Sequence, residues 1–326
     1  MSKAPRNGMG WRSLEEFILA LEQRGELLRV SHPVDVELEA GCIADLLVKR
    51  GGPAVIFDQP RLEDGSISRY PLAMNLFGTR DRTNLALDVV EPKEIGEMMT
   101  GLMKPDIGGI MKRPWTGLGL LRQGISMAPR KVSRGKCQQV RMDNPDVTRL
   151  PIPTSWPQDG GPFMTLPLVV TSDPETGVHN LGMYRSQVFG PDEVGLHWQK
   201  HKHGADHAEA SDDRMPVAIC LGGPPQVIFS AISPLPDNLS EYEFAGLLSR
   251  RRLKITKCLT NDLWVPADCD FVIEGYTLPS EKRVEGPFGD HFGHYSLEDE
   301  YPVMHVTAIT HRKDPIIPMT IVGIPP

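Results

Sequence analysis

The stretch from residue 178 to residue 204 concentrates side chains that could hold a ligand. It contains an amide, a guanidinium and four of the chain's ten histidines. These polar residues are Asn180, Arg185, His179, His197, His201 and His203. Amide, guanidinium and imidazole groups bind anions and metal ions in proteins. A lone histidine is more often a packing or surface residue, but this density makes a ligand site an equally good interpretation.

Two further stretches carry carboxylates that could join this site. The sequence from Ser240 to Glu243 is a capping box, which predicts a helix with Glu241 in its first turn. An acid at that position is also explained by the helix dipole. Glu285 and Asp290 lie among glycines, where turn chemistry alone could account for the aspartate.

The residue types also indicate a metal. Asn180 and Glu241 offer oxygen atoms of the kind that hard divalent cations bind, and an added imidazole would suit Mn²⁺ better than Ca²⁺. Asn180 and Arg185, however, lie on one predicted strand at an odd spacing, so strict alternation would place them on opposite faces. A single site containing both would require a bulge or a ligand near the strand.

Helices alternate with strands in the first part of the chain. A capping box at Ser13 to Glu16, followed by apolar residues at helical spacing and a stop at Gly25, predicts the first helix. The other elements expected here are a helix at roughly 37–50, buried strands at 54–57 and 72–76, and a helix from near Pro92. This alternation predicts an α/β layer.

The second part of the chain is dominated by predicted strands. Proline and glycine interrupt the pattern between about residues 104 and 153, which predicts a domain junction near residue 130. Beyond it, the turn residues 173–177 predict a hairpin loop. Strands are expected at 166–171, 178–188, 217–221, 226–231, 254–259, 271–276 and 304–310. Many short strands with few helices favour a β-barrel.

Composition narrows the class of protein. The chain has 326 residues, 40% of them hydrophobic, which is enough for two domains with cores. Its net charge of -7 and the lack of a sustained basic block argue against nucleic acid as a partner. We interpret the short run Arg250-Arg-Arg252 as a solvated helix end in preference to a phosphate site.

The cysteines and the apolar runs indicate where the protein works. Five cysteines, an odd number without metal-type spacing, together with no signal peptide at the amino end, indicate a reduced, cytoplasmic protein. No apolar run has the length of a bilayer span. We therefore expect a soluble protein, or one that is at most peripheral to the inner membrane.

The motifs taken together resemble the UbiD family of reversible decarboxylases. The chain resembles in particular those members that act on 4-hydroxy-3-polyprenylbenzoate. The resemblance runs from about Trp11 to the carboxyl end, and family members continue past Pro326. It rests on HNLGMYR at 179–185, SEYEFAGLL at 240–248 and EGPFGDHFGHY at 285–295, with GGPAVIF at 51–57, NLFGT at 75–79 and LPIPTSWPQDGGPF at 150–163.

The resemblance implies an α+β fold in two domains. The first is an N-terminal α/β domain at 1–130. The second is a catalytic domain at 131–326, a split β-barrel related to flavin reductase folds that binds the cofactor. The family's C-terminal domain, which covers the active site and helps to build homo-oligomers, is missing from this chain, so we expect a lower oligomeric state.

The resemblance also implies a cofactor and its ligands. The family uses prenylated FMN, whose phosphate is held through a divalent metal, typically Mn²⁺, with a monovalent cation such as K⁺ nearby. The implied metal ligands are Asn180, Glu241 and His203, and His201 competes with His203 for the third place. The implied cofactor contacts are Met183, Tyr184, Arg185, His197, Trp198, Gln199, Lys202 and His203.

The catalytic residues that the resemblance implies are Arg185, Glu285 and Asp290. Arg185 would hold the substrate carboxylate, because a guanidinium binds it bidentately and keeps its charge. Glu285, paired with that cation, should stay ionised. Asp290 would give and take the proton at the reacting carbon, and an apolar wall of Phe288, Phe292 and the flavin would favour its protonated form.

The expected activity is that of a non-oxidative carboxy-lyase dependent on prenylated FMN. The most similar members indicate 4-hydroxy-3-polyprenylbenzoate in ubiquinone biosynthesis as substrate, with CO₂ as product and a flavin prenyltransferase as supplier of the cofactor. Two alternatives stay open. One is a decarboxylase of another aromatic, heteroaromatic or α,β-unsaturated acid, and the other is a flavin-binding fragment without turnover.

Overall fold

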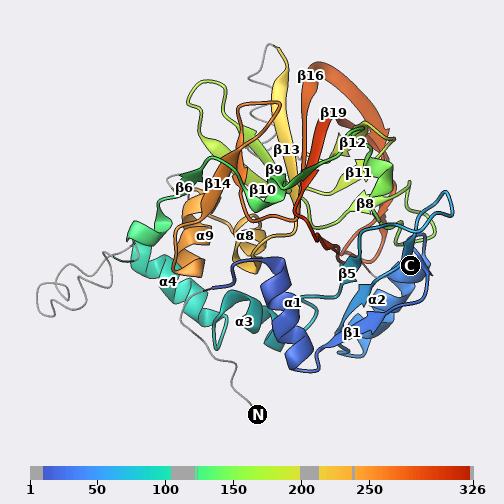
Figure 1. The fold of residues 1–326 in the computed structure, drawn as a ribbon, viewed down its shortest axis with the longest axis horizontal. Coiled ribbons are helices and arrows are strands. Elements are labelled where there is room, and N and C mark those ends of the chain that lie inside the picture. The colour runs from blue at the N-terminus through green and yellow to red at the C-terminus, as the bar shows by residue number, and fades with distance from the viewer. Residues whose placement is uncertain (1–9, 104–121, 123, 199–212, 237–238, 324–326) are drawn as a thin grey trace, which may run out of the picture.

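In a computed structural model of the chain, a layer of helices and a small sheet lies against a larger, strongly curved antiparallel sheet (Figure 1). The structure describes residues 10–103, 122, 124–198, 213–236 and 239–323. It is a mixed α+β fold, as predicted.

The helices are α1 (Leu14–Gln23), α2 (Glu39–Lys49), α3 (Arg80–Leu87), α4 (Lys93–Met103), α8 (Pro225–Ser230) and α9 (Glu241–Ser249), with short 3₁₀ turns at Lys136–Gln138 and Val147–Arg149. The strands of the first layer and its neighbours are β1 (Leu27–Val30), β2 (Val34–Asp35), β3 (Ala54–Phe57), β4 (Pro60–Arg61), β5 (Leu72–Met74), β6 (Arg130–Val132) and β7 (Val140–Arg141). The remaining strands are β8 (Phe163–Met164), β9 (Leu168–Ser172), β10 (His179–Met183), β11 (Ser186–Val188), β12 (Glu193–Leu196), β13 (Met215–Leu221), β14 (Lys254–Lys257), β15 (Trp264–Pro266), β16 (Phe271–Glu285), β17 (Phe288–Gly289), β18 (Tyr295–Ser296), β19 (Asp299–His311) and β20 (Ile317–Pro318).

The small sheet has the strand order β1-β3-β5-β20, and its strand β3 is buried on both faces. Because side chains alternate along a strand, Ala54 and Ile56 of β3 pack with helix α1, while Val55 and Phe57 join the core shared with the large sheet. Strand β20, near the end of the chain, pairs in parallel with β5. The first layer is therefore completed by a strand from the far end of the sequence.

Helix α1 begins as its sequence predicts. The hydroxyl of Ser13 accepts a hydrogen bond from the backbone N–H of Glu16 at 3.2 Å, which satisfies one of the free N–H groups of the first turn. Gly25, two residues beyond the helix, has a φ of +68°. The predicted strand at 54–57 and the helix near Pro92 are also confirmed.

The large sheet has the strand order β10-β9-β13-β16-β19-β12-β11-β8, and β7 pairs with β19. Its two faces belong to different cores. In β13, Val217 and Ile219 face the core shared with the first layer, while Ala218 and Cys220 face helices α8 and α9 and the sheet β15-β14-β6. Long strands β16 and β19 curve strongly (Figure 1).

Two local predictions need correction, and one helix was not expected. The apolar run at 226–231, predicted as a strand, is helix α8. Pro225 occupies its first turn, a position that suits proline, and Gly222 and Gly223 end strand β13 with positive φ angles. Helix α3 was not predicted, because it has no clear apolar stripe. The strand predicted at 178–188 is interrupted at Tyr184 and Arg185, which separate β10 from β11.

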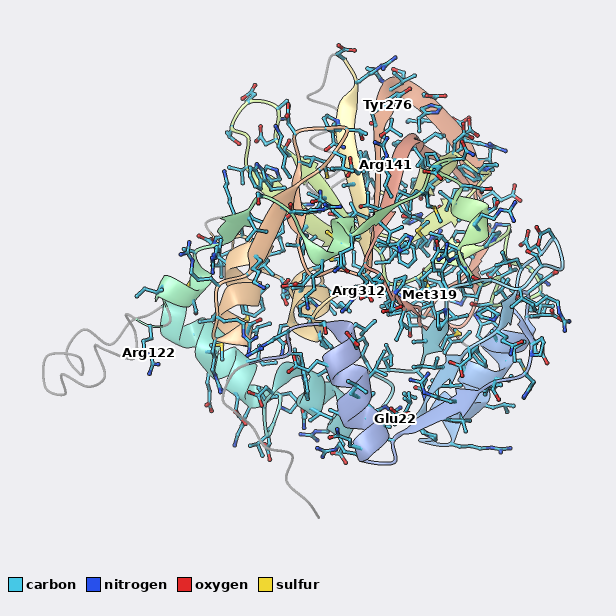
Figure 2. All side chains as sticks on the ribbon, in the orientation of Figure 1. Glu22, Arg122, Arg141, Tyr276, Arg312 and Met319 are labelled. Atoms are coloured by element: carbon cyan, nitrogen blue, oxygen red, sulfur yellow. The ribbon has the colours of Figure 1, made fainter. Side chains whose placement is uncertain are left out.

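Polar contacts join the first layer to the large sheet. Arg312 lies between them (Figure 2), and its Nη2 lies 2.7 Å from Glu15 of α1. The hydroxyl of Tyr70 and Nε2 of His311 are 3.3 Å apart. A boundary near residue 130 stays a prediction.

The cysteines and the helices bear on disulfide bonding and on membrane spans. All five cysteines are free in the structure. None of the helices in the described part of the chain has both the length and the apolar character of a membrane span.

Candidate active site

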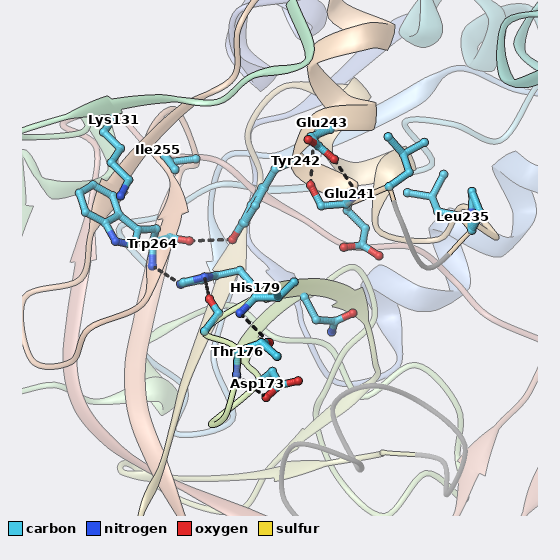
Figure 3. A pocket seen from close by; sticks show the side chains of 16 residues that line it. Lys131, Asp173, Thr176, His179, Leu235, Glu241, Tyr242, Glu243, Ile255 and Trp264 are labelled. Atoms are coloured by element: carbon cyan, nitrogen blue, oxygen red, sulfur yellow. Dashed lines mark hydrogen bonds between the residues drawn. The ribbon is translucent and has the colours of Figure 1, made fainter. Parts of the chain in front are cut away.

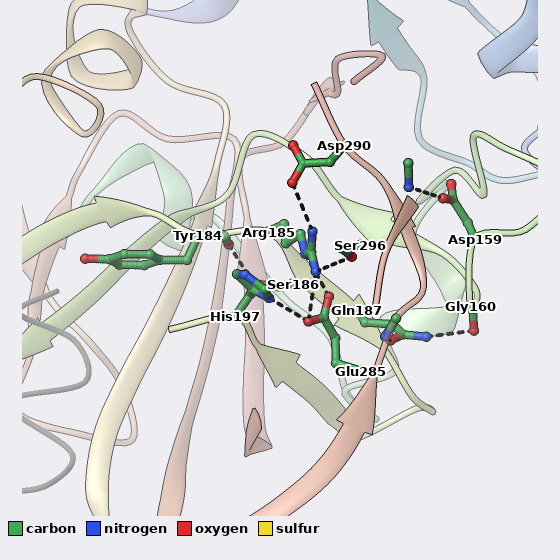
Figure 4. Close-up of polar contacts among 12 residues, drawn as sticks. Asp159, Gly160, Tyr184, Arg185, Ser186, Gln187, His197, Glu285, Asp290 and Ser296 are labelled. Carbon is green, nitrogen blue, oxygen red and sulfur yellow. Dashed lines mark hydrogen bonds and ion pairs between the residues drawn. The ribbon is translucent and has the colours of Figure 1, made fainter. Parts of the chain in front are cut away.

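Arg185 lies at the break between β10 and β11 and forms a bidentate ion pair with Glu285, the last residue of β16 (Figure 4). Its Nε donates to Oε1 of Glu285 at 2.8 Å, and its Nη2 donates to Oε2 at 3.3 Å and to the hydroxyl of Ser296 at 3.0 Å. The Arg185 side chain is 11% exposed and that of Glu285 is fully buried. A planar guanidinium held on one side in this way keeps a fixed orientation.

His197 completes the environment of Glu285. Its Nδ1 lies 2.7 Å from Oε2 of Glu285, and its ring lies 4.2 Å from the ring of Tyr301. Burial alone would raise the pKa of Glu285, but the hydrogen bonds from His197 and Arg185, and then their charges, outweigh it and lower that pKa. Glu285 is therefore an ionised carboxylate at neutral pH.

Asp290 lies on the other side of the guanidinium. Its Oδ2 is 3.9 Å from Nη1 of Arg185, and its side chain is 27% exposed. Its Oδ1 accepts a hydrogen bond from the backbone N–H of His291 and contacts the ring of that residue. The structure thus brings together Arg185, Glu285 and Asp290, three residues that are far apart in sequence.

The apolar wall expected beside Asp290 is present only in part. The ring of Phe288 lies 4.6 Å from the guanidinium carbon of Arg185, and Phe163 packs against Phe288. Phe292, by contrast, is 70% exposed and packs against His291. The expectation that Phe292 shields Asp290 is therefore wrong for this structure, because the loop directs that ring outward.

Two side chains that were not predicted from the sequence, those of Asp159 and Gln187, hold the segment between Glu285 and Asp290. Asp159 accepts hydrogen bonds from the backbone N–H groups of Gly289 (2.8 Å), Trp156 (2.9 Å) and Ser155 (3.2 Å). Burial raises the pKa of Asp159, although these bonds oppose the shift.

Gln187 makes a second connection between the same segments. Its amide donates to the carbonyl of Gly160 at 2.7 Å and accepts from the N–H of Gly286 at 2.9 Å. We call this pair, Asp159 and Gln187, the clamp. The only sequence signal for it was the turn-rich motif at 150–163, which did not assign a role to the aspartate.

A second group of predicted residues lines a cavity of about 790 Å³ between β10 and the start of α9 (Figure 3). Asn180 and Glu241 both line this cavity, which we call the Asn180 cavity. The buried amide nitrogen of Asn180 has no hydrogen-bond partner among the described residues. Glu241 accepts a hydrogen bond from the N–H of Leu181 at 3.2 Å, which holds it next to Asn180.

His179 also lines the Asn180 cavity, although no role was predicted for it. Its Nε2 accepts a hydrogen bond from the N–H of Trp264 at 3.1 Å, so Nδ1 carries the proton and donates to the carbonyl of Gly177 at 3.1 Å. Burial lowers the pKa of His179. The ring is therefore neutral, and both nitrogen atoms are engaged.

The predicted metal site is described only in part. Gln199, His201, Lys202 and His203 lie outside the described residues. In the part of the chain that the structure describes, no three His, Cys, Asp or Glu side chains form a metal-binding group. Asn180 and Glu241 therefore share a cavity, while the third predicted ligand stays a prediction.

The other predicted cofactor contacts in the described part of the chain are neighbours of Arg185 and His197 in sequence. Tyr184 is largely buried and points away from the guanidinium (Figure 4). Trp198 is buried, and its indole N–H has no partner within the described ranges. The N–H of Met183 donates to the carbonyl of Ala231 at 3.2 Å. Arg185 does not line the Asn180 cavity, and it lies beyond the end of β10, so the alternation expected along one continuous strand does not apply to it.

Comparisons with known families match most of the chain. Residues 130–325 match the family described as UbiD, 3-octaprenyl-4-hydroxybenzoate carboxy-lyase Rift-related domain. Residues 18–100 match the one described as UbiD_N, 3-octaprenyl-4-hydroxybenzoate carboxy-lyase N-terminal domain. An uncharacterized protein of Archaeoglobus fulgidus is 44% identical over 322 residues, which are 98% of this chain and 65% of that protein. The chain thus spans less than two thirds of that relative.

Solved structures share the fold. The closed form of vanillic acid decarboxylase from Sedimentibacter hydroxybenzoicus is 29% identical with a TM-score of 0.84, covering 99% of this chain and 66% of that one. An evolved dimeric form of the UbiD-class enzyme HmfF from Pelotomaculum thermopropionicum, in complex with prFMN, is 28% identical with a TM-score of 0.82, covering 96% and 68%.

Proposed function

The chain belongs to the UbiD family, and on that premise we propose that it is a non-oxidative decarboxylase of an aromatic acid that depends on prenylated FMN. The observation that carries the proposal is the arrangement around Arg185. A buried ion pair fixes one side of the guanidinium, and a second carboxylate, that of Asp290, lies 3.9 Å from its Nη1. Similar solved proteins are a vanillic acid decarboxylase and an enzyme in complex with prFMN, which supports this class of reaction.

Residues of the Asn180 cavity and residues around Arg185 would together hold the cofactor. Asn180 and Glu241 would hold its phosphate through a divalent ion such as Mn²⁺, with His203 as third ligand and K⁺ as a nearby monovalent ion. The unpartnered amide nitrogen of Asn180 and the cavity of about 790 Å³ fit a bound group, because a buried donor without a partner is costly and a phosphate oxygen would satisfy it. The N–H of Trp198 and the residues around Arg185 would contact the ring system. When bound, prenylated FMN supplies an electron sink for the carbon that loses CO₂.

Arg185 would bind and orient the substrate carboxylate. Its Nε and Nη2 are engaged by Glu285 and Ser296, so the Nη1 edge is the part that can receive an acid group. A guanidinium keeps its charge throughout the reaction and so suits binding, not proton transfer. The ion pair with Glu285 prevents the guanidinium from turning.

Asp290 would move the proton. Glu285 is ill suited to this because its hydrogen bonds with His197 and Arg185 hold it in the ionised form. Asp290 is partly exposed, lies beside the edge that would receive the substrate, and can reach a carbon held there. A general acid must first be within reach of the atom it protonates.

The substrate is the finer part of the proposal. We favour 4-hydroxy-3-polyprenylbenzoate in ubiquinone biosynthesis, with a flavin prenyltransferase supplying the cofactor, and such a lipid substrate would bring the enzyme to the inner membrane surface. Another aromatic, heteroaromatic or α,β-unsaturated acid is the alternative, and the vanillic acid decarboxylase among the similar structures favours it. We further propose that the large sheet is a split β-barrel of the flavin reductase type.

A panel of acids tests the function. The protein is co-expressed with a flavin prenyltransferase, the bound flavin is measured by absorbance, and release of CO₂ is followed for polyprenylated and unprenylated hydroxybenzoates, vanillate and a furan acid. Asp290→Asn should keep the flavin and lose on the order of 10² to 10⁴ in rate. Glu298→Gln, which removes an exposed carboxylate from the same loop region, should change neither.

Two results would overturn the proposal. The first is that the Asp290→Asn variant incorporates deuterium from solvent into the product at the same rate as the wild type, because the proton would then come from another group. The second is flavin-loaded protein that turns over none of the acids, which would leave flavin binding without catalysis.

A further inference from the structure

A small cavity that shares no residue with the Arg185 cluster or the Asn180 cavity has strongly cationic walls. It has a volume of about 260 Å³ and lies where the first described residues meet the end of helix α9. Its charged lining residues are Arg12, Arg251, Arg252, Lys254 and Asp268. We call it the Arg251 cavity. Four of these five side chains carry positive charge, so the cavity attracts anions.

Arg251 differs from its neighbour Arg252 in how its guanidinium is used. Arg252 donates from Nε to the carbonyl of Ala128 at 2.8 Å and from Nη2 to that of Pro129 at 3.0 Å, which is a structural role. The Nε of Arg251 is buried and has no partner in the described part of the chain. A buried donor without an acceptor is costly, and a ligand oxygen would satisfy it.

The positive charges of the cavity are not balanced by its acids. Asp268 pairs with Lys254 at 3.6 Å. Glu16, which lies nearby, accepts a hydrogen bond from the backbone N–H of Arg12 at 2.6 Å. Within the described residues neither the Arg12 nor the Arg251 side chain forms an ion pair. Burial first, and then the charge of Arg12, lowers the pKa of Arg251, so the two cations repel each other.

The dipole of helix α9 does not account for Arg251. Cations are favoured at the C-terminal end of a helix because free carbonyl groups gather there. Here the carbonyls of Gly246 and Leu247 accept backbone N–H groups of Arg251 and Arg250, and that of Ser249 accepts the N–H of Gly10. The orphaned Nε of Arg251 contributes nothing to these carbonyls.

Backbone contacts hold the walls of the cavity in place. The N–H of Gly10 donates to Ser249 at 3.0 Å, and a side chain at Gly10 would come within 2.5 Å of Gln226. The indole of Trp11 donates to the carbonyl of Leu85 at 2.9 Å. Arg12 and Arg251 are therefore brought together by the fold itself, without a ligand.

We propose that the Arg251 cavity binds a phosphate group, either inorganic phosphate or the end of a phosphomonoester. Guanidinium forks match the oxygen atoms of an oxyanion, and the unsatisfied Nε supplies a buried donor. The volume is below the range of pockets for drug-sized ligands, which excludes a whole mononucleotide. The site is independent of the proposed decarboxylase activity and revises the interpretation of the Arg250-Arg-Arg252 run as a solvated helix end.

Calorimetric titration with inorganic phosphate, and in parallel with glycerol phosphate, tests the proposal at constant ionic strength. Arg251→Gln should weaken binding roughly tenfold or more, as expected for loss of a charged hydrogen bond, and Arg251→Lys should weaken it less. Arg250→Gln is the matched control, because Arg250 belongs to the same run but pairs with Asp88 at 3.7 Å and does not line the cavity. Lys131→Gln controls for phosphate entering the Asn180 cavity.

Specific outcomes decide the matter. Saturable binding of either compound that is lost in Arg251→Gln and kept in both controls supports the site, and the compound that binds more tightly identifies the source of the phosphate. Absence of saturable binding in the millimolar range overturns it, as does an equal loss in Arg250→Gln or Lys131→Gln. Circular dichroism and thermal unfolding of each variant show that a loss of binding is not a loss of folding.

Discussion

At the scale of single residues, the environment of each carboxylate decides what it can do. Glu285 is fully buried, yet its pKa is lowered because Arg185 and His197 both contact it. Asp290, five positions further along, touches the same guanidinium only at 3.9 Å and reaches solvent. Two acids from one short motif therefore have different surroundings, which is how a pair of carboxylates can divide binding and proton transfer.

The charge of Glu285 should be visible in stability. Breaking a buried ion pair by removing one partner typically costs about 3 to 5 kcal/mol, so Glu285→Gln should lower the free energy of unfolding by that order at neutral pH. A carboxyl whose pKa is lowered on folding stabilises the protein above its ordinary pKa of 4.5 and loses that contribution as the pH falls through the folded value. The difference in the free energy of unfolding between variant and wild type, measured with urea, should therefore become smaller in acid. A constant gap would contradict this role.

Asp270 should show the opposite dependence on pH. Burial raises its pKa to about 6 from 3.8, despite Arg312 and hydrogen bonds from the N–H groups of Gly223 and Ile316. Between these values the folded state holds a proton that the unfolded state has lost, so stability falls as the pH rises, by on the order of 3 kcal/mol in total.

Asp270→Asn removes that titration. The variant loses a hydrogen-bond acceptor, a cost that does not depend on pH, but its stability relative to wild type should improve from about pH 4 to pH 6. Urea unfolding across this range measures the difference. If the free energies of unfolding of the two proteins changed with pH in parallel, folding would not raise the pKa of Asp270.

At the scale of elements, the clamp sets the position of the segment between the two acids. Asp159→Asn keeps the shape of the side chain but turns one acceptor oxygen into a donor. With its remaining oxygen toward the two N–H groups of Ser155 and Trp156, the new NH₂ group faces the N–H of Gly289. An unsatisfied buried N–H costs about 1 to 3 kcal/mol. Amide hydrogen exchange at Gly289 and Asp290 should therefore become faster. Asp146→Asn, which alters an exposed cap of similar type, should leave this exchange unchanged, and equal rates in all three proteins would show that the clamp does not restrain the segment.

Elements with strong local signals were predictable from sequence, and those decided by tertiary packing were not. Helix α1 has a cap, a periodic apolar face and a stop, and it forms where expected. Helix α8 is a short apolar run buried on all sides, and such a run has no period that separates a helix from a strand. The break at Tyr184 and Arg185 was also invisible locally, because it depends on how β10 and β11 pair with different strands.

The candidate site was predictable only through its motifs. Arg185, Glu285 and Asp290 were grouped by resemblance to a family, since nothing in their spacing brings them together. The alternation expected between Asn180 and Arg185 assumes one continuous strand, and β10 ends at Met183, so it does not apply to Arg185. Asp159 was missed because its function lies in contacts across more than a hundred residues of sequence, where a turn aspartate looks ordinary.

At the scale of the whole molecule, the first layer and the large sheet share one core. Val55 and Phe57 of the small sheet belong to the same buried cluster as Val169 and Ile219 of the large one. Strand β20 crosses back to pair with β5. Two parts that bury their apolar faces against each other lose that burial together when either part unfolds.

We therefore predict that the chain unfolds in a single transition. In urea, far-UV circular dichroism and the fluorescence of a variant with both Trp11→Phe and Trp115→Phe should give the same midpoint. Its remaining tryptophans are Trp156, Trp198 and Trp264, which lie outside the first layer. Tyr70→Phe removes the hydrogen bond to His311 and should lower the free energy of unfolding by about 1 kcal/mol. Because the change lies in the first layer, a coupled core requires the fluorescence midpoint of the large sheet to fall equally. A fluorescence midpoint that stays fixed while circular dichroism shifts would show instead that the two parts unfold separately.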